Sequence, residues 1–72
     1  MQEWCDLCQA MRDMAEGYAA TDSINGWLYR SEASQFCDEG TPADDHELAL
    51  RRAIAATLRQ RWAARLAAAS NS

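Results

Sequence analysis

The sequence predicts an all-α protein: a small antiparallel hairpin or bundle of two to three helices, built on one long C-terminal helix. Residues that favour strands are scarce, with no Val, two Ile and three Thr, whereas Ala occurs fifteen times. Apolar side chains recur every three or four positions, and neither Gly nor Pro follows Pro42. Seventy-two residues suffice for one small core, so we expect a single helical domain over residues 1–72.

The first helix is expected over about residues 3–20. Trp4, Met11 and Tyr18 are spaced by seven, with further apolar residues between them, which is typical of a helix that buries one stripe. Gly17 weakens the last turns, so the end of this helix is fixed only to within a turn.

The second helix is expected over about residues 22–38, with Asp22 near its start and Gly40 just after its end. An alternative is a structured connection through Trp27, Leu28 and Tyr29, followed by a shorter helix capped by Ser31. The conformation of residues 20–30 is therefore the least determined part of the prediction.

The third helix is expected over about residues 42–69. Thr41 suits the N-cap and Pro42 the first turn, where a missing N–H costs nothing. Acidic residues then crowd the N-terminal end of the helix dipole, and arginines fill the later turns.

An apolar stripe on this third helix repeats every four residues through Leu50, Ile54, Leu58, Trp62 and Leu66. A spacing of four drifts by about 40° per step, so the stripe winds around the helix. The helix would be about 42 Å long, whereas a compact domain of this size is roughly 28 Å across. The C-terminal end should therefore project beyond its own domain, and a homodimer that buries it is expected.

Trp, Tyr and Arg dominate the residues on which binding interfaces depend. The sequence therefore predicts a partner or dimer interface at Arg61, Trp62, Arg65, Leu66, Leu58 and Tyr29. Trp27, in contrast, is expected in the core, against Trp4 and Met11.

The charge is unevenly distributed along the chain. Residues 1–48 hold all eleven acids and two arginines, a net charge of −9, while residues 49–72 hold five arginines and no acid. Such a chain could occupy a basic, nucleic-acid-binding groove of another protein. Direct binding to nucleic acid is not expected, because the arginines fall on two sides of the helix and the net charge is −4.

The segment from Trp4 to Cys8, W-C-D-L-C, resembles over five residues the W-C-x-x-C of thioredoxin-like oxidoreductases. That chemistry needs an acidic thiol behind a strand, but no strand is expected here and Asp6 lies between the thiols. Zinc offers a different use of these side chains, with Cys5, Cys8, Cys37 and His46 as a tetrahedral set.

An enzyme is not expected, because the acidic side chains and His46 near the start of the third helix radiate instead of converging, and no phosphate-binding loop or nucleophile motif is present. No secretory signal and no apolar run of membrane-spanning length is found, and three cysteines suit a reducing compartment, so a cytoplasmic protein is expected.

The function predicted from these observations is that of a non-enzymatic, protein-binding regulator or inhibitor without a cofactor. Its size and acidity suit a protein encoded by a phage or mobile element that occupies a surface of a larger host protein, such as one that handles nucleic acid or acts in defence. The alternative is a small regulatory or nucleic-acid-binding module stabilised by zinc at the cysteine and histidine set.

Overall fold

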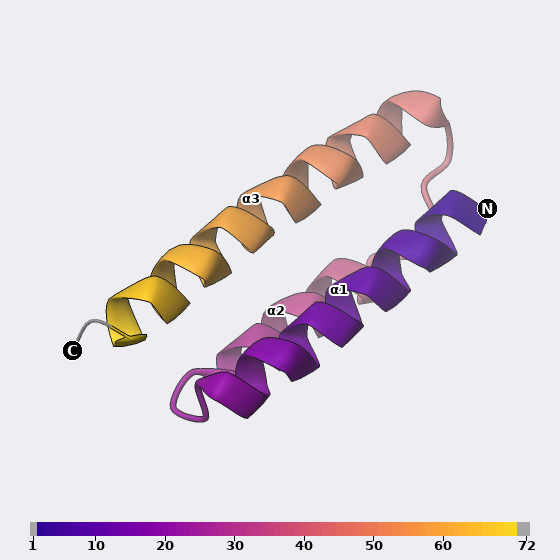
Figure 1. The fold of residues 1–72 in the computed structure, drawn as a ribbon. Coiled ribbons are helices and arrows are strands. Elements are labelled where there is room, and N and C mark those ends of the chain that lie inside the picture. The colour runs from indigo at the N-terminus through magenta and orange to yellow at the C-terminus, as the bar shows by residue number, and fades with distance from the viewer. Residues whose placement is uncertain (1, 71–72) are drawn as a thin grey trace.

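The computed structural model describes residues 2–70, and all regular structure in that range is helical, which confirms the predicted all-α class. It contains three helices, α1 (Gln2–Thr21), α2 (Gly26–Asp38) and α3 (Asp45–Ser70), joined by two short connections (Figure 1).

The three helices lie side by side along their lengths. The start of α1 meets the end of α2, where the rings of Trp4 and Phe36 are 4.9 Å apart, and the end of α1 meets the start of α2, where Tyr18 and Tyr29 are 5.5 Å apart. The chain then reverses again, so that α3 runs in the same direction as α1 (Figure 1). The result is an elongated molecule of 43 × 16 × 15 Å.

Helices α1 and α2 approach each other closely because small residues line their contact. Ala15 and Ala19 of α1 and Gly26 and Ala33 of α2 are all buried. A Cβ atom on Gly26 would lie 3.1 Å from the Cβ of Ala19, tighter than ordinary van der Waals contact. Gly26 therefore lets the first turn of α2 pack directly on α1.

The turn between α1 and α2 is organised by a buried carboxylate. Asp22 accepts hydrogen bonds from the backbone N–H of Asn25 at 3.3 Å, from its side-chain amide at 2.8 Å and from the hydroxyl of Tyr29 at 3.2 Å. These bonds hold a tight turn over residues 23–25, so α2 begins at Gly26 and not at Asp22 as expected.

The connection between α2 and α3 is longer than expected. Gly40 has φ = +83°, a left-handed conformation that suits glycine just after a helix. Asp44 then caps α3, since its carboxylate accepts the backbone N–H of Glu47 at 2.8 Å, and Glu47 reaches back to the N–H of Ala43 at 3.0 Å. This stronger cap, three residues after Thr41, starts α3 at Asp45 instead of Pro42.

The buried face of α3 follows a heptad pattern that differs from the predicted stripe. The buried residues are spaced alternately by three and four: Leu48, Arg51, Ala55, Leu58 and Trp62. Only Leu58 and Trp62 of the predicted stripe belong to this set, while Leu50 and Ile54 are exposed. The stripe does wind around the helix, and its N-terminal part is the part that leaves the core.

Candidate interaction surface

Trp62 is completely buried within its own chain. Its indole ring packs 5.4 Å from the ring of Tyr29 and 6.0 Å from that of Tyr18, edge-on to the latter. The expectation that Trp62 projects beyond the other helices is therefore wrong. The prediction assumed a rounded domain, but the molecule is elongated, and α1 and α2 reach as far along it as Trp62.

The carboxylate of Glu32 on α2 contacts the polar groups of three α3 side chains at and beside this tryptophan. The indole N–H of Trp62 donates to Glu32, and the guanidinium groups of Arg65 and Arg61 lie 3.4 and 3.7 Å from the same carboxylate. Three of the residues predicted at an interface with a partner thus meet a helix of their own chain. No sequence pattern pointed to Glu32, because its partners Trp62 and Arg65 are about thirty positions away.

The other residues of the predicted interface are divided between core and surface. Tyr29 is fully buried and Leu58 nearly so, Leu66 is half-buried, and Arg61 keeps much of its side chain exposed. Within this folded chain a partner can reach Arg61, Arg65 and Leu66, so a contact there stays a prediction for these three.

The expectation that Trp27 packs in the core is also wrong, since 69% of its surface is exposed. The inward positions of α2 are Gly26, Tyr29, Ala33 and Phe36, at helical spacing. Trp27 follows Gly26 by one residue, about 100° around the helix, and therefore faces outward. Ile24, in the turn just before α2, is 83% exposed as well. We call these two exposed apolar residues, Ile24 and Trp27, the Trp27 patch.

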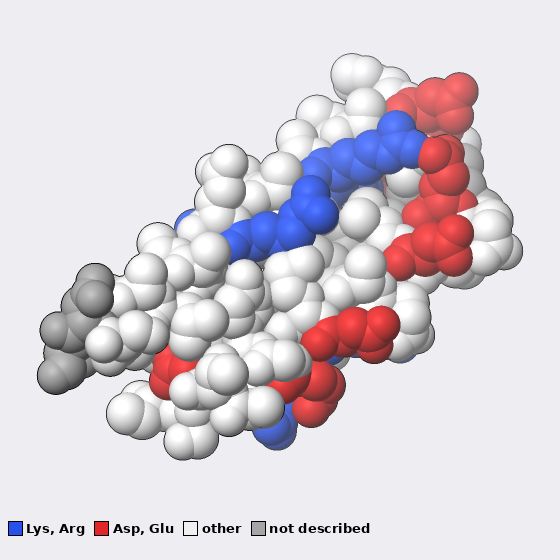
Figure 2. Space-filling model, viewed as in Figure 1, with Lys and Arg blue, Asp and Glu red and all other residues white. Residues whose placement is uncertain are grey.

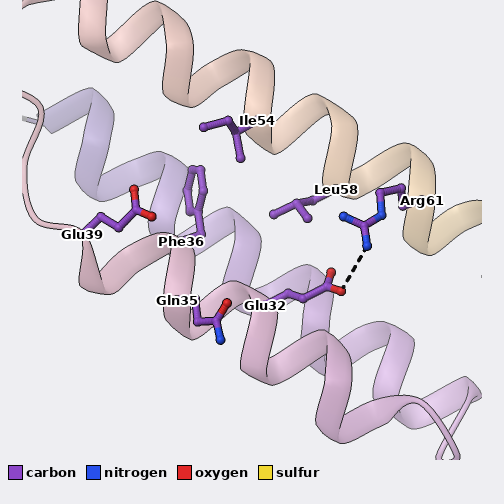
Figure 3. Close-up of a pocket in the computed structure, with 7 residues that line it drawn as sticks. All are labelled: Glu32, Gln35, Phe36, Glu39, Ile54, Leu58 and Arg61. Carbon is purple, nitrogen blue, oxygen red and sulfur yellow. Dashed lines mark ion pairs between the residues drawn. The ribbon is translucent and has the colours of Figure 1, made fainter.

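A groove runs between α2 and α3 on one side of the bundle (Figure 3). Phe36 of α2 points toward Ile54 of α3 across it, and Leu58 extends its apolar floor. Glu32 and Arg61 face each other at one end (Figure 3). The full set that lines the groove is Glu32, Gln35, Phe36, Glu39, Ile54, Leu58 and Arg61.

The groove continues onto the outer face of α3, which carries a second heptad pattern. We call this face the outer seam; it consists of Glu47, Leu50, Ile54, Thr57 and Arg61, spaced by three and four. Leu50 is 53% and Ile54 46% exposed, although both are large apolar residues. The outer seam is thus apolar in the middle, acidic at one end and basic at the other.

Arginine side chains are mostly paired within the chain. Arg51 is buried, lies 5.3 Å from the ring centre of Trp4, and contacts the carboxylates of Glu39 and Glu47. Arg52 pairs with Glu3. Figure 2 shows an arginine run along one side of the molecule and acidic residues gathered at the end where the N-terminus lies and α3 begins. These intramolecular pairs reduce both the basic surface available to phosphate and the acidic surface available to a basic groove.

The cysteines and His46 do not form the tetrahedral set considered above. Cys5 is exposed, Cys8 is buried, Cys37 is half-buried, and His46 is exposed near the start of α3. In residues 2–70, no three His, Cys, Asp or Glu side chains are grouped so that they could hold a metal ion. The close pair is Cys8 and Cys37, which are distant in sequence: the Cys37 thiol donates to the backbone carbonyl of Cys8, with 3.7 Å between sulfur and oxygen.

Comparison with known proteins finds no match among family models, curated proteins or solved structures. Over the described part of the chain, no helix has both the length and the apolar character that crossing a bilayer requires.

Proposed function

We propose that this chain is a non-enzymatic protein-binding module that forms a homodimer through the outer seam and presents its remaining surface to a larger protein. The observation that carries this proposal is the exposure of Leu50 and Ile54 beside the groove formed with Phe36 and Leu58. Large apolar residues side by side on a helix face, next to an apolar hollow, are typical of a surface that another helix covers.

The charges on the outer seam favour an antiparallel pairing of two α3 helices. Glu47 and Arg61 are each seven residues from Ile54, about 10 Å along the helix on either side. With Ile54 near the two-fold axis, Arg61 of each copy faces the acidic end of the other. A parallel pairing would instead oppose Arg61 to Arg61 and Glu47 to Glu47, which costs free energy.

Trp27 and Ile24 favour a second, larger protein as partner. Their patch lies at the turn between α1 and α2, on residues that the outer seam does not include, so a dimer formed through the outer seam leaves another apolar surface uncovered. A small module with one surface for itself and one for a partner suits a regulator or inhibitor. Inhibition as the direction of its effect, a host protein as target and a phage origin remain predictions from the sequence.

Sedimentation equilibrium of the wild type, Ile54→Glu and Ala63→Glu tests the dimer. Ala63 is exposed on α3 but faces away from the outer seam. Ala63→Glu therefore adds the same charge to the same helix at a position outside the proposed dimer contact. We expect a dimer for the wild type and Ala63→Glu, and a monomer for Ile54→Glu with unchanged helicity. A monomeric wild type at high micromolar concentration, or a dimeric Ile54→Glu, would show that the outer seam does not pair.

The larger partner is tested separately. Immobilised wild type, Trp27→Glu and Ile54→Glu are compared for the proteins that they retain from the same source, with purified candidates then titrated individually. A partner bound through the Trp27 patch should be lost from Trp27→Glu and kept by Ile54→Glu. Equal retention by all three variants would remove the proposed role of this patch.

A further inference from the structure

We propose that Cys8 and Cys37 are a site of reversible oxidation, at which a peroxide converts the two thiols into a disulfide that ties α1 to α2 within one chain. This inference does not depend on the proposed function, because it rests on the contact between two helices of the same chain.

The α1–α2 contact brings Cys37 of α2 next to Cys8 of α1. The thiol of Cys37 lies against the backbone of Cys8, 3.7 Å from its carbonyl oxygen, and is near enough to the Cys8 thiol to raise its pKa. The helices are held close at this end by the packing of Trp4 on Phe36, and further along by the small residues at their contact. A disulfide needs such a short separation between two backbones.

A surface hollow gives a small oxidant access to this pair. Cys37, Cys8 and the exposed Cys5 all line it, together with Arg12 and the backbone of Gly40. Burial, reinforced by the neighbouring Cys37, raises the pKa of the Cys8 thiol to about 12. Cys8 therefore stays protonated at neutral pH. Within the pair, the half-buried sulfur of Cys37 is more accessible to an oxidant than the buried sulfur of Cys8, so oxidation begins at Cys37.

The chemistry balances with a peroxide as the two-electron oxidant. The sulfur of Cys37 attacks one oxygen of hydrogen peroxide, the O–O bond breaks, and a sulfenic acid and one water are formed. The sulfur of Cys8 then attacks the sulfenic sulfur and displaces its hydroxyl group, which leaves as water with the proton of Cys8. In total two S–H bonds are lost, one S–S bond forms and one peroxide becomes two waters.

The competing pair is Cys5 and Cys8, three residues apart in the first turns of α1. Cys5 is exposed, and its sequence motif would favour it as the partner of Cys8. The structure favours Cys37 because its sulfur already contacts the backbone carbonyl of Cys8 across the α1–α2 contact.

Peptide mapping separates these pairings. The full chain is treated with hydrogen peroxide, the remaining thiols are alkylated, and the protein is digested with trypsin. Cleavage after Arg12, Arg30 and Arg51 places Cys5 and Cys8 in residues 1–12 and Cys37 in residues 31–51. We expect these two peptides to be linked, with Cys5 alkylated and the link reversed by dithiothreitol.

Variants complete the assignment. Cys5→Ser should keep the link, whereas Cys8→Ala and Cys37→Ser should each lose it while remaining helical. Oxidised Cys5→Ser should also melt at a higher temperature than its reduced form, because the bond closes a loop between residues 29 positions apart. A disulfide within residues 1–12, a link between two chains, a link that survives in Cys8→Ala, or no disulfide at all would each overturn the proposal.

Discussion

At the residue scale, a few buried polar side chains decide how the apolar residues are arranged. Asp22 is the clearest example, since it is almost fully buried and accepts hydrogen bonds from Asn25 and Tyr29. The hydrogen bond from the Asn25 amide, followed by those from the Asn25 backbone and from Tyr29, lowers the pKa of Asp22 below its usual value, although burial opposes this shift. The same contact raises the pKa of Tyr29, for which burial is the largest cause.

Stability should consequently depend on the ionisation of Asp22. Because its pKa is lower in the folded chain than in the unfolded chain, the folded state gains stability from the charged form above about pH 4 and loses this gain as pH falls through the folded pKa. Asp22→Asn should lower the melting temperature at pH 7, and the difference from the wild type should shrink toward pH 3.

The matched control is Asp13→Asn, which changes an exposed carboxylate whose hydrogen bond comes from Gln9 on the same helix. Melting curves by circular dichroism between pH 3 and pH 7 measure both variants. If Asp22→Asn and Asp13→Asn show the same small effect at every pH, the buried carboxylate does not organise the turn.

The residue scale is also where the sequence was least informative. The sequence singled out Trp62, which is fully buried and donates a hydrogen bond to Glu32. Glu32 is thirty positions away, so this pairing depends on how α2 and α3 pack and cannot be predicted from spacing. The exposure of Trp27 depends on the start of α2 at Gly26, which in turn depends on the hydrogen bonds of Asp22. Side-chain pairs between helices follow from packing, and spacing within one helix does not reveal them.

At the element scale, the existence of the three helices follows from composition and periodicity, whereas their ends follow from caps. For α3, the prediction placed the start at Thr41 and Pro42, whereas Asp44 and Glu47 form the hydrogen bonds of the cap. The buried positions of α3 are spaced alternately by three and four residues, and two of them are Arg51 and Ala55. Neither is a large apolar residue, so a pattern of large apolar residues does not include them.

Ala55 tests this heptad pattern, because it is fully buried in the centre of the α3 contact. Ala55→Leu should destabilise the fold by about 1–3 kcal/mol, since a larger side chain must displace well-packed neighbours. In a domain of this size each 1 kcal/mol lowers the melting temperature by about 4–8 °C.

Ala63→Leu is the control, because position 63 is on the same helix but exposed. Its effect should stay within about 0.5 kcal/mol. Urea unfolding followed by circular dichroism measures both. A tolerated Ala55→Leu would mean that α3 does not present position 55 to the other two helices.

At the scale of the whole molecule, the elongated shape limits how much apolar surface one chain can bury. The inward faces of the three helices form a thin core in a molecule 43 Å long and about 16 Å wide. Trp4 and Phe36 pack at one end of this core, and Tyr18, Tyr29 and Trp62 pack at the other. Domains of this length are marginally stable when they rely on one small core. Covering Leu50 and Ile54 in a dimer would add to the free energy of unfolding.

The melting temperature should therefore depend on protein concentration. If two folded chains pair and unfolded chains do not, dilution shifts the balance toward unfolding. We expect the melting temperature of the wild type to fall when its concentration is reduced a hundredfold. The melting temperature of Ala63→Glu should fall in the same way. Ile54→Glu should melt at a temperature that does not change with concentration, close to the wild-type value at the lowest concentration. A melting temperature independent of concentration in all three proteins would indicate that one chain is stable alone and that the outer seam is free for a different protein.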